Sequence, residues 1–300
     1  MSRFKRCGIL LLAVVLFALD NILLKALPEG TSPFGVLTLS CGLAAPILTL
    51  CFKKRLRKKI EVREHVRIFL MAGGFTLFNT LNILSLRYLG VNDSSFIFSL
   101  TVALVPIFNL FLGKRYPLST WLGVAIIVGG VWFASGAVYN GDELWGGVLS
   151  FLGAVVRAFF LIALNRASKK VDGGKMIVEI IWLVALFSAL VWLVLDPGGI
   201  ISFGFGAKTL LPVLGFALLS IVIGNSMVIL VQQYTTEVET AVILSVQLIF
   251  TVLFMAVVPA VFESPEPITM VNAFGCGLIV MGSILATCNV SGLLKRQRVG

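Results

Sequence analysis

The chain has 300 residues, which is long enough for two soluble domains of about 150 residues each, but its composition excludes that arrangement. Hydrophobic residues make up 58% of the sequence and charged residues 13%, whereas soluble domains contain about 45–50% and about 25%. So few charges could not cover so much apolar surface in water, so we expect a membrane protein. Its formal net charge is +10.

Ten apolar stretches follow one another along the chain, separated by charged residues or by proline and glycine. Each is long enough to cross about 30 Å of hydrocarbon as a helix, which takes about 20 residues. We therefore predict an all-α membrane protein with ten transmembrane helices. The predicted helices cover residues 7–27, 34–52, 67–86, 92–112, 117–136, 145–165, 175–195, 209–230, 236–260 and 267–289.

Basic residues are concentrated at one end of this predicted bundle. Twenty of the 24 Lys and Arg residues fall at the N-terminus, between residues 53 and 67, after the fourth and sixth predicted helices, and at the C-terminus. The positive-inside rule then places both termini in the cytoplasm of a multi-pass protein of the cell (inner) membrane. Anionic lipid explains the basic run 53–59 better than nucleic acid does, so no nucleic-acid partner is expected.

Two stretches far apart in the sequence show the same order of features. One reads RYLGVNDSSFIFSLTVALVPIFNLFLGKR from Arg87, and the other reads QYTTEVETAVILSVQLIFTVLFMAVV from Gln233. In each, a tyrosine precedes an apolar helix dotted with Ser and Thr, and a short turn and a glycine-bearing helix follow. Five helices per half is an odd number, so the second half must enter the membrane upside down. We therefore predict inverted five-helix repeats at residues 1–137 and 144–290, with a cytoplasmic tail at 291–300.

These stretches, with WLGVAIIVGGV after the first and FGCGLIVMGSIL after the second, resemble the EamA-type members of the drug/metabolite transporter superfamily. The resemblance covers nearly the whole chain. It implies ten helices, a central cavity and transport of small organic solutes or metabolites. The family often has a Glu-Pro pair in the ninth helix, where this chain has Gln247-Leu248. A role of that glutamate therefore does not carry over.

Polar residues inside the predicted helices are the candidates for a site, because polar groups at bilayer depth are costly and normally face the bundle interior. Arg157 could hold an anionic group of a substrate, such as a carboxylate. We expect substrate binding by Asn21, Asn79, Asn82, Arg157, Trp182, Asn225 and Gln247, and coupling by Asp20 and Glu179.

Structural roles for the same residues remain open at this point. Arg157 could instead pair with Glu179 or extend toward the cytoplasm, and Lys25 could extend to the outer headgroups. The amides could simply hold helices together.

The sequence offers little for catalysis. Its single histidine, His65, lies in the basic loop, and no HExxH, P-loop or Gly-x-Ser-x-Gly pattern is present. The five cysteines form no CxxC pattern. We therefore expect no enzyme activity, no cofactor and no metal.

The sequence thus predicts a secondary transporter, a monomer or homodimer, that moves amino acids or related small metabolites by alternating access, with proton coupling or exchange. The alternatives are a lipid-linked-sugar flippase or nucleotide-sugar exchanger of the same fold, a membrane-embedded lipid-modifying enzyme, and a receptor without transport.

Overall fold

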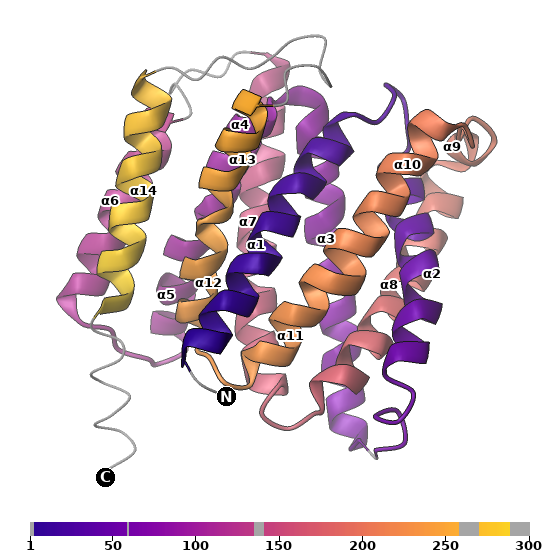
Figure 1. Ribbon diagram of the computed structural model, residues 1–300, viewed down its shortest axis with the longest axis horizontal. Coiled ribbons are helices and arrows are strands. Elements are labelled where there is room, and N and C mark those ends of the chain that lie inside the picture. Colours follow the sequence, from indigo (N-terminus) through magenta and orange to yellow (C-terminus); the bar gives the residue numbers. More distant parts are fainter. Residues whose placement is uncertain (1–2, 59, 135–140, 258–269, 289–300) are drawn as a thin grey trace.

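The computed structural model describes residues 3–58, 60–134, 141–257 and 270–288, and within these ranges the regular structure is helical (Figure 1). The first half contains α1 (Arg3–Lys25), α2 (Pro33–Cys51), α3 (Val62–Tyr88), α4 (Val91–Ser99), α5 (Thr101–Phe111) and α6 (Leu118–Ala134). The second half contains α7 (Asp142–Ala167), α8 (Gly173–Leu195), α9 (Pro197–Ile201), α10 (Ala207–Gly215), the π-helix η1 (Phe216–Asn225), α11 (Ser226–Gln232), α12 (Glu237–Ser245), α13 (Gln247–Val257) and α14 (Met270–Cys288).

The described residues contain eight helical segments that are long and apolar enough to cross a membrane, and two shorter apolar helices, α6 and α14. Together they follow the order of the ten predicted helices. The one-turn helix α9 lies in a connection between two of them (Figure 1). The chain is therefore an all-α, multi-pass membrane protein. The predicted boundary at residue 137 and the tail 291–300 lie outside the described residues.

Three predicted helices, the fourth, the eighth and the ninth, are not continuous α-helices, which corrects the sequence prediction. The eighth contains the π-helix η1 between α10 and α11. The fourth is divided into α4 and α5 at Leu100, and the ninth into α12 and α13 at Val246. At both breaks the backbone N–H donates to the carbonyl oxygen three residues earlier, as in a 3₁₀ turn. Leu100 lies twelve residues after Tyr88, and Val246 lies twelve residues after Tyr234, so the breaks fall at equivalent points of the two similar stretches.

The packing of the helices follows the inverted repeat. The largest contacts join α6 to α14, α3 to α7, and α2 to α8, and α1 packs along the eighth span, made of α10, η1 and α11. The repeat relates the first five spans, in order, to the last five. It exchanges α6 with α14 and α2 with α8, so each of these two contacts is its own equivalent. It relates the α3–α7 contact to the contact between α1 and the eighth span. Two inverted five-helix repeats produce this pattern.

Glycines bring α6 and α14 into backbone contact. A Cβ on Gly123 would lie 2.5 Å from the Gly282 carbonyl oxygen, and one on Gly282 would lie 2.7 Å from the Gly123 carbonyl oxygen. Further along, a Cβ on Gly130 would lie 2.9 Å from the Gly275 carbonyl oxygen. The helices α6 and α14 therefore pack closely because these positions carry no side chain.

Residues 52–58, 112–117 and 168–172, which follow α2, α5 and α7, lie at one end of the bundle, called the basic end below (Figure 1). The beginning of α1 and the end of α14 lie at this same end (Figure 1). This arrangement agrees with an even number of spans.

Ion pairs connect the two halves at the basic end. Asp172, which caps α8 by accepting from the backbone N–H of Gly174, also accepts from Lys58 Nζ at 2.6 Å and lies 3.5 Å from Arg55. Burial by itself raises the pKa of Asp172, but the Lys58 hydrogen bond and the two positive charges outweigh it, so this pKa lies below its usual value. Lys114 pairs with Glu237 in the same region.

Candidate binding cavity in the centre of the bundle

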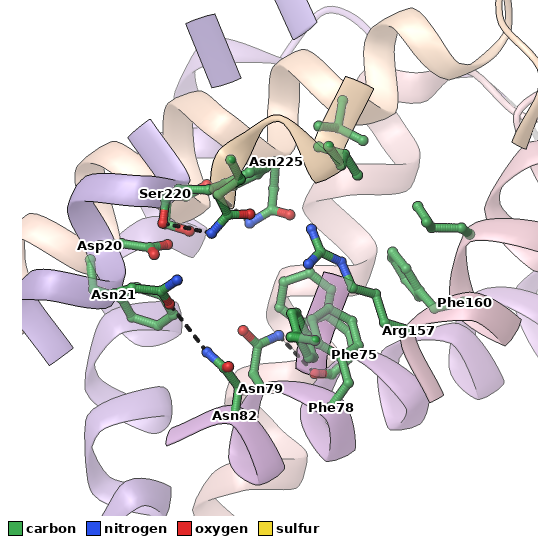
Figure 2. Close-up of a pocket in the computed structure, with 17 residues that line it drawn as sticks. Asp20, Asn21, Phe75, Phe78, Asn79, Asn82, Arg157, Phe160, Ser220 and Asn225 are labelled. Atoms are coloured by element: carbon green, nitrogen blue, oxygen red, sulfur yellow. Dashed lines mark hydrogen bonds between the residues drawn. The ribbon is translucent and has the colours of Figure 1, made fainter. Parts of the chain in front are cut away.

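A central cavity lies where α1, α3, α7 and η1 meet the breaks of the fourth and ninth spans (Figure 2). Its volume is about 60 Å³, which is room for a few water molecules. Seven of the nine residues named from the sequence line it: Asp20, Asn21, Asn79, Asn82, Arg157, Asn225 and Gln247. The cavity in this conformation is therefore narrow, polar and built from both halves.

Arg157 projects from α7 into this cavity (Figure 2). Its guanidinium carbon lies 4.7 Å from the ring centroid of Phe98, in α4, which is a cation–π distance. Among the described residues, no carboxylate lies within 4.0 Å of the Arg157 guanidinium. The pair with Glu179, which the sequence left open as an alternative, does not form, because Glu179 pairs with His65 and Lys175. The ring of Phe98 packs against the guanidinium, and the N–H groups of Arg157 face the cavity (Figure 2).

Asp20 lies on α1 at the opposite wall of the cavity, with 5% of the residue exposed (Figure 2). Its carboxylate lies beside Ser220 of η1, and the charge of Arg157 acts on it across the cavity. The cavity therefore presents a buried carboxylate and a partly buried guanidinium on facing walls.

Amide side chains connect α1 to α3 beside these charges. Asn82 donates from Nδ2 to Oδ1 of Asn21, and Asn21 donates from Nδ2 to Ser95 Oγ, both at 3.4 Å. Asn79 donates to the carbonyl oxygen of Phe75 at 2.9 Å, which leaves its own amide oxygen toward the cavity (Figure 2). The two 3.4 Å bonds of Asn21 are long, so these amides keep hydrogen-bonding capacity for a ligand.

The π-helix η1 places two further groups on the cavity wall. Asn225 donates from Nδ2 to the Ser220 carbonyl oxygen at 3.0 Å, a contact across five residues that fits the wider π turn. A Cβ on Gly224 would lie 2.6 Å from Cε1 of Phe17, so the glycine lets α1 approach this turn. The apolar sequence of η1 gives no signal for a π-helix, so Ser220 could not have been found from the sequence.

Gln247 begins α13 directly after the break of the ninth span. It donates from Nε2 to the carbonyl oxygen of Phe17 at 2.9 Å, and so connects this break to the middle of α1. An amide can make this bond, whereas an ionised glutamate cannot, because it has no donor.

Three aromatic rings form an apolar wall of the cavity. The ring centroids of Phe75 and Phe78 lie 5.0 Å apart, and that of Phe160 lies 5.5 Å from each. Phe160 and Phe75 were not named from the sequence, because nothing distinguishes them among 23 phenylalanines. Their place in the cavity is decided by the packing of α3 against α7.

Two residues named from the sequence lie away from the cavity. Trp182 is 50% exposed on α8 and donates its indole N–H to Thr49 at 3.0 Å. Glu179 lies near the basic end, 3.2 Å from His65 and 3.7 Å from Lys175. The position of Glu179 follows from the start of α8 at Gly173, which puts the second turn of the helix near the basic end. Trp182 lies in the third turn, on the face of α8 that contacts Thr49 of α2.

Lys25 does not line the central cavity. Its ammonium donates to the carbonyl oxygens of Leu86 at 2.7 Å and Leu89 at 3.0 Å, at the C-terminus of α3. A cation at a helix C-terminus satisfies carbonyl groups that have no partner in the helix. Lys25 is therefore a capping residue.

The described residues offer no cluster of three or more His, Cys, Asp or Glu side chains that could hold a metal ion. The groups that line the cavity include one carboxylate, one guanidinium, several amides and several aromatic rings.

Comparison with known proteins agrees with this architecture. Residues 6–136 match the model of the EamA-like transporter family. The first half of the chain is therefore similar to this family of transporters. A solved structure titled "Crystal structure of protein" has the same fold, with a TM-score of 0.72 and 18% sequence identity over 97% of this chain and 99% of that one. No curated protein matches the sequence.

Proposed function

We propose that this transporter carries amino acids or related small metabolites that bear both a carboxylate and an ammonium group. The observation that carries the proposal is the placement of Asp20 and Arg157 on facing walls of one central cavity (Figure 2). A zwitterion between them would neutralise two charges of the cavity wall, one of them buried, that otherwise face each other only across the cavity.

Each part of such a substrate has a group to bind it. The planar guanidinium of Arg157 can hold a carboxylate through two parallel hydrogen bonds. Asp20 can accept from an ammonium group, and Asn79 and Asn82 can bind polar atoms between them. The ring of Phe160 and its aromatic neighbours can pack against an apolar side chain.

The rest of the transport cycle follows from the repeats. We propose that residues 1–137 and 144–290 move relative to one another and bend at the breaks at Leu100 and Val246, because broken helices border the site. The positive-inside rule makes the basic end cytoplasmic. The pairs of Asp172 and Glu237 with basic residues of the other half then close the cytoplasmic side in this conformation.

Proton coupling, if the cycle uses it, belongs to Asp20, because it is the acidic side chain that lines the described cavity. Glu179 was the second coupling candidate, but its ion pairs lie near the basic end. A coupling role for Asp20 predicts that its neutralisation removes the dependence of uptake on a pH gradient.

The exchange of nucleotide sugars is less well supported than transport of zwitterions. A nucleotide sugar carries two phosphate charges, and Arg157 is the one basic side chain that lines the cavity described here. Recognition of phosphate normally uses several cations or backbone amides.

The test is counterflow in liposomes that contain the purified chain, with labelled amino acids, the matching amines and the matching carboxylic acids. Zwitterions are expected to exchange at least ten times faster than either analogue. R157Q should remove discrimination against the amines, and D20N should remove discrimination against the carboxylic acids. The variant R63Q, on the exposed beginning of α3, controls for loss of charge. Equal flux of all three substrate classes in the wild type would contradict the proposal.

A further inference from the structure

A second hollow lies on the outer face of α3 and α7, separate from the central cavity. Its volume is about 460 Å³, and apolar side chains of both helices line most of it. Leu70 and Phe159 are 67% and 53% exposed on this face, so the hollow opens toward lipid. We call it the α3–α7 groove.

Two arginines stand at one end of the α3–α7 groove. Arg67 belongs to the second turn of α3, and Arg166 is the next-to-last residue of α7, so both lie at the basic end. Arg67 donates to Glu64 at 2.7 Å, and Lys170 lies 3.6 Å from the same carboxylate. Arg166 is exposed, and among the described residues its side chain has no ion pair or hydrogen bond. Positive charge therefore exceeds negative charge at this end.

The groove continues from these charges into the apolar part of the membrane. Arg67 and Gly74 are seven residues apart on α3, which is about 10 Å of helix. A Cβ on Gly74 would have no neighbour closer than 4.0 Å, so the glycine leaves part of the groove open. A ligand that fills this space needs an anionic head and an apolar tail.

We infer that the α3–α7 groove binds an anionic phospholipid of the leaflet at the basic end. Its phosphate would lie between Arg67 and Arg166, and one acyl chain would lie along Gly74, Val156 and Ala163. A basic pocket between transmembrane helices on the cytoplasmic side suits such a headgroup. A free inorganic or organic anion would leave the larger, apolar part of the groove uncovered.

The groove and the central cavity share one side chain. Phe160 lines both, and it is 7% exposed. An acyl chain in the groove would therefore lie against the outer side of the aromatic wall of the cavity.

The test measures lipids retained by the purified full-length chain in native mass spectrometry, with phosphatidylglycerol and phosphatidylcholine of identical acyl chains as the probes. The wild type is expected to retain phosphatidylglycerol at least five times more often than phosphatidylcholine. R67Q/R166Q should abolish this preference, because it removes both headgroup contacts. Glutamine at position 67 still offers an amide donor to Glu64.

The matched control is R63Q/K169Q, which removes the same charge from two exposed residues that do not line the groove. This variant should keep the preference of the wild type. Equal loss in both double variants would identify general attraction to the basic end and overturn the proposal, as would a wild type without preference.

A second variant tests the groove without a change of charge. A163F fills the apolar part, so it should reduce retention of phosphatidylglycerol while the monodisperse, helical state of the protein is kept. Unchanged retention in a folded A163F protein would show that lipid does not use the groove.

Discussion

Gln247 at the start of α13 donates a 2.9 Å hydrogen bond to the carbonyl oxygen of Phe17 in the middle of α1. This bond joins the two halves of the molecule at the break of the ninth span. It also gives a structural role to the position where EamA-type transporters, which the chain resembles, often have glutamate.

Replacing this amide by a carboxylate should destabilise the protein at neutral pH. In Q247E an ionised side chain would face the Phe17 carbonyl oxygen as a second acceptor, and the cost of such an unmade buried bond is about 1–3 kcal/mol. Thermal unfolding in detergent measures the effect. The melting temperature of Q247E should rise toward that of the wild type as the pH falls and the carboxyl gains a proton. A melting temperature equal to that of the wild type at pH 7.5 would show that the bond is unimportant.

Asp20 and Arg157 should behave as a coupled pair in a double-mutant cycle. Each single neutralisation leaves the other charge in the cavity wall without its opposing charge, whereas D20N/R157Q leaves neither. We expect the double variant to be more stable than the two single effects predict, by about 0.5–3 kcal/mol. Strict additivity in unfolding experiments would mean that the two charges do not interact.

Glycine is required at Gly282 but not at Gly277 of the same helix. A Cβ at Gly282 would lie 2.7 Å from a backbone oxygen of α6, whereas one at Gly277 would meet nothing within 4 Å. G282A should therefore lower the unfolding free energy by about 1–3 kcal/mol, because backbone atoms must move. G277A is the matched control and should be neutral or slightly stabilising. The close packing of α6 against α14 is disproved if both variants melt at the same temperature.

Asp172 should contribute to stability in a pH-dependent way. Its pKa lies below the usual value, so its contribution is complete above the ordinary aspartate pKa of about 3.9 and is lost as the pH falls through the lowered pKa. D172N keeps a cap for α8 but loses the attraction of Lys58 and Arg55. D172A loses the cap as well, at a further cost of about 1 kcal/mol.

Melting temperatures measured across this pH range provide the check. The difference between the wild type and D172N should shrink toward zero at the acidic end, and the difference between D172N and D172A should persist. A difference in melting temperature between the wild type and D172N that grows as the pH falls would contradict this prediction.

Trp182 should be dispensable for substrate binding although it was named as a candidate. The residue is half-exposed on α8, and its indole N–H donates to Thr49, which lies outside the cavity. W182F should leave the KM for uptake unchanged within a factor of two, while N79A should raise it severalfold because Asn79 lines the cavity. A large rise of KM in W182F would place the substrate elsewhere.

The sequence determined the membrane class, the order of the spans and the inverted repeat. Apolar stretches of about 20 residues leave a chain few options other than spanning helices, because backbone groups in lipid must bond within their own segment. Polar groups are costly in lipid, so the sequence also predicted that Asp20, Asn79, Asn82 and Arg157 face the interior. In the structure they line one cavity.

Tertiary structure alone decided the details of that cavity. Whether Arg157 faces Asp20 or Glu179 depends on which helices pack together, and α7 packs on α3 and on the broken fourth span, so its cation reaches Phe98. The π turn of η1 and the breaks at Leu100 and Val246 carry no periodic signal, because all three lie within apolar stretches that would otherwise form ordinary helices. Lipid favours an apolar helix whatever its neighbours are, but the position of each polar group around it is set by contacts between helices.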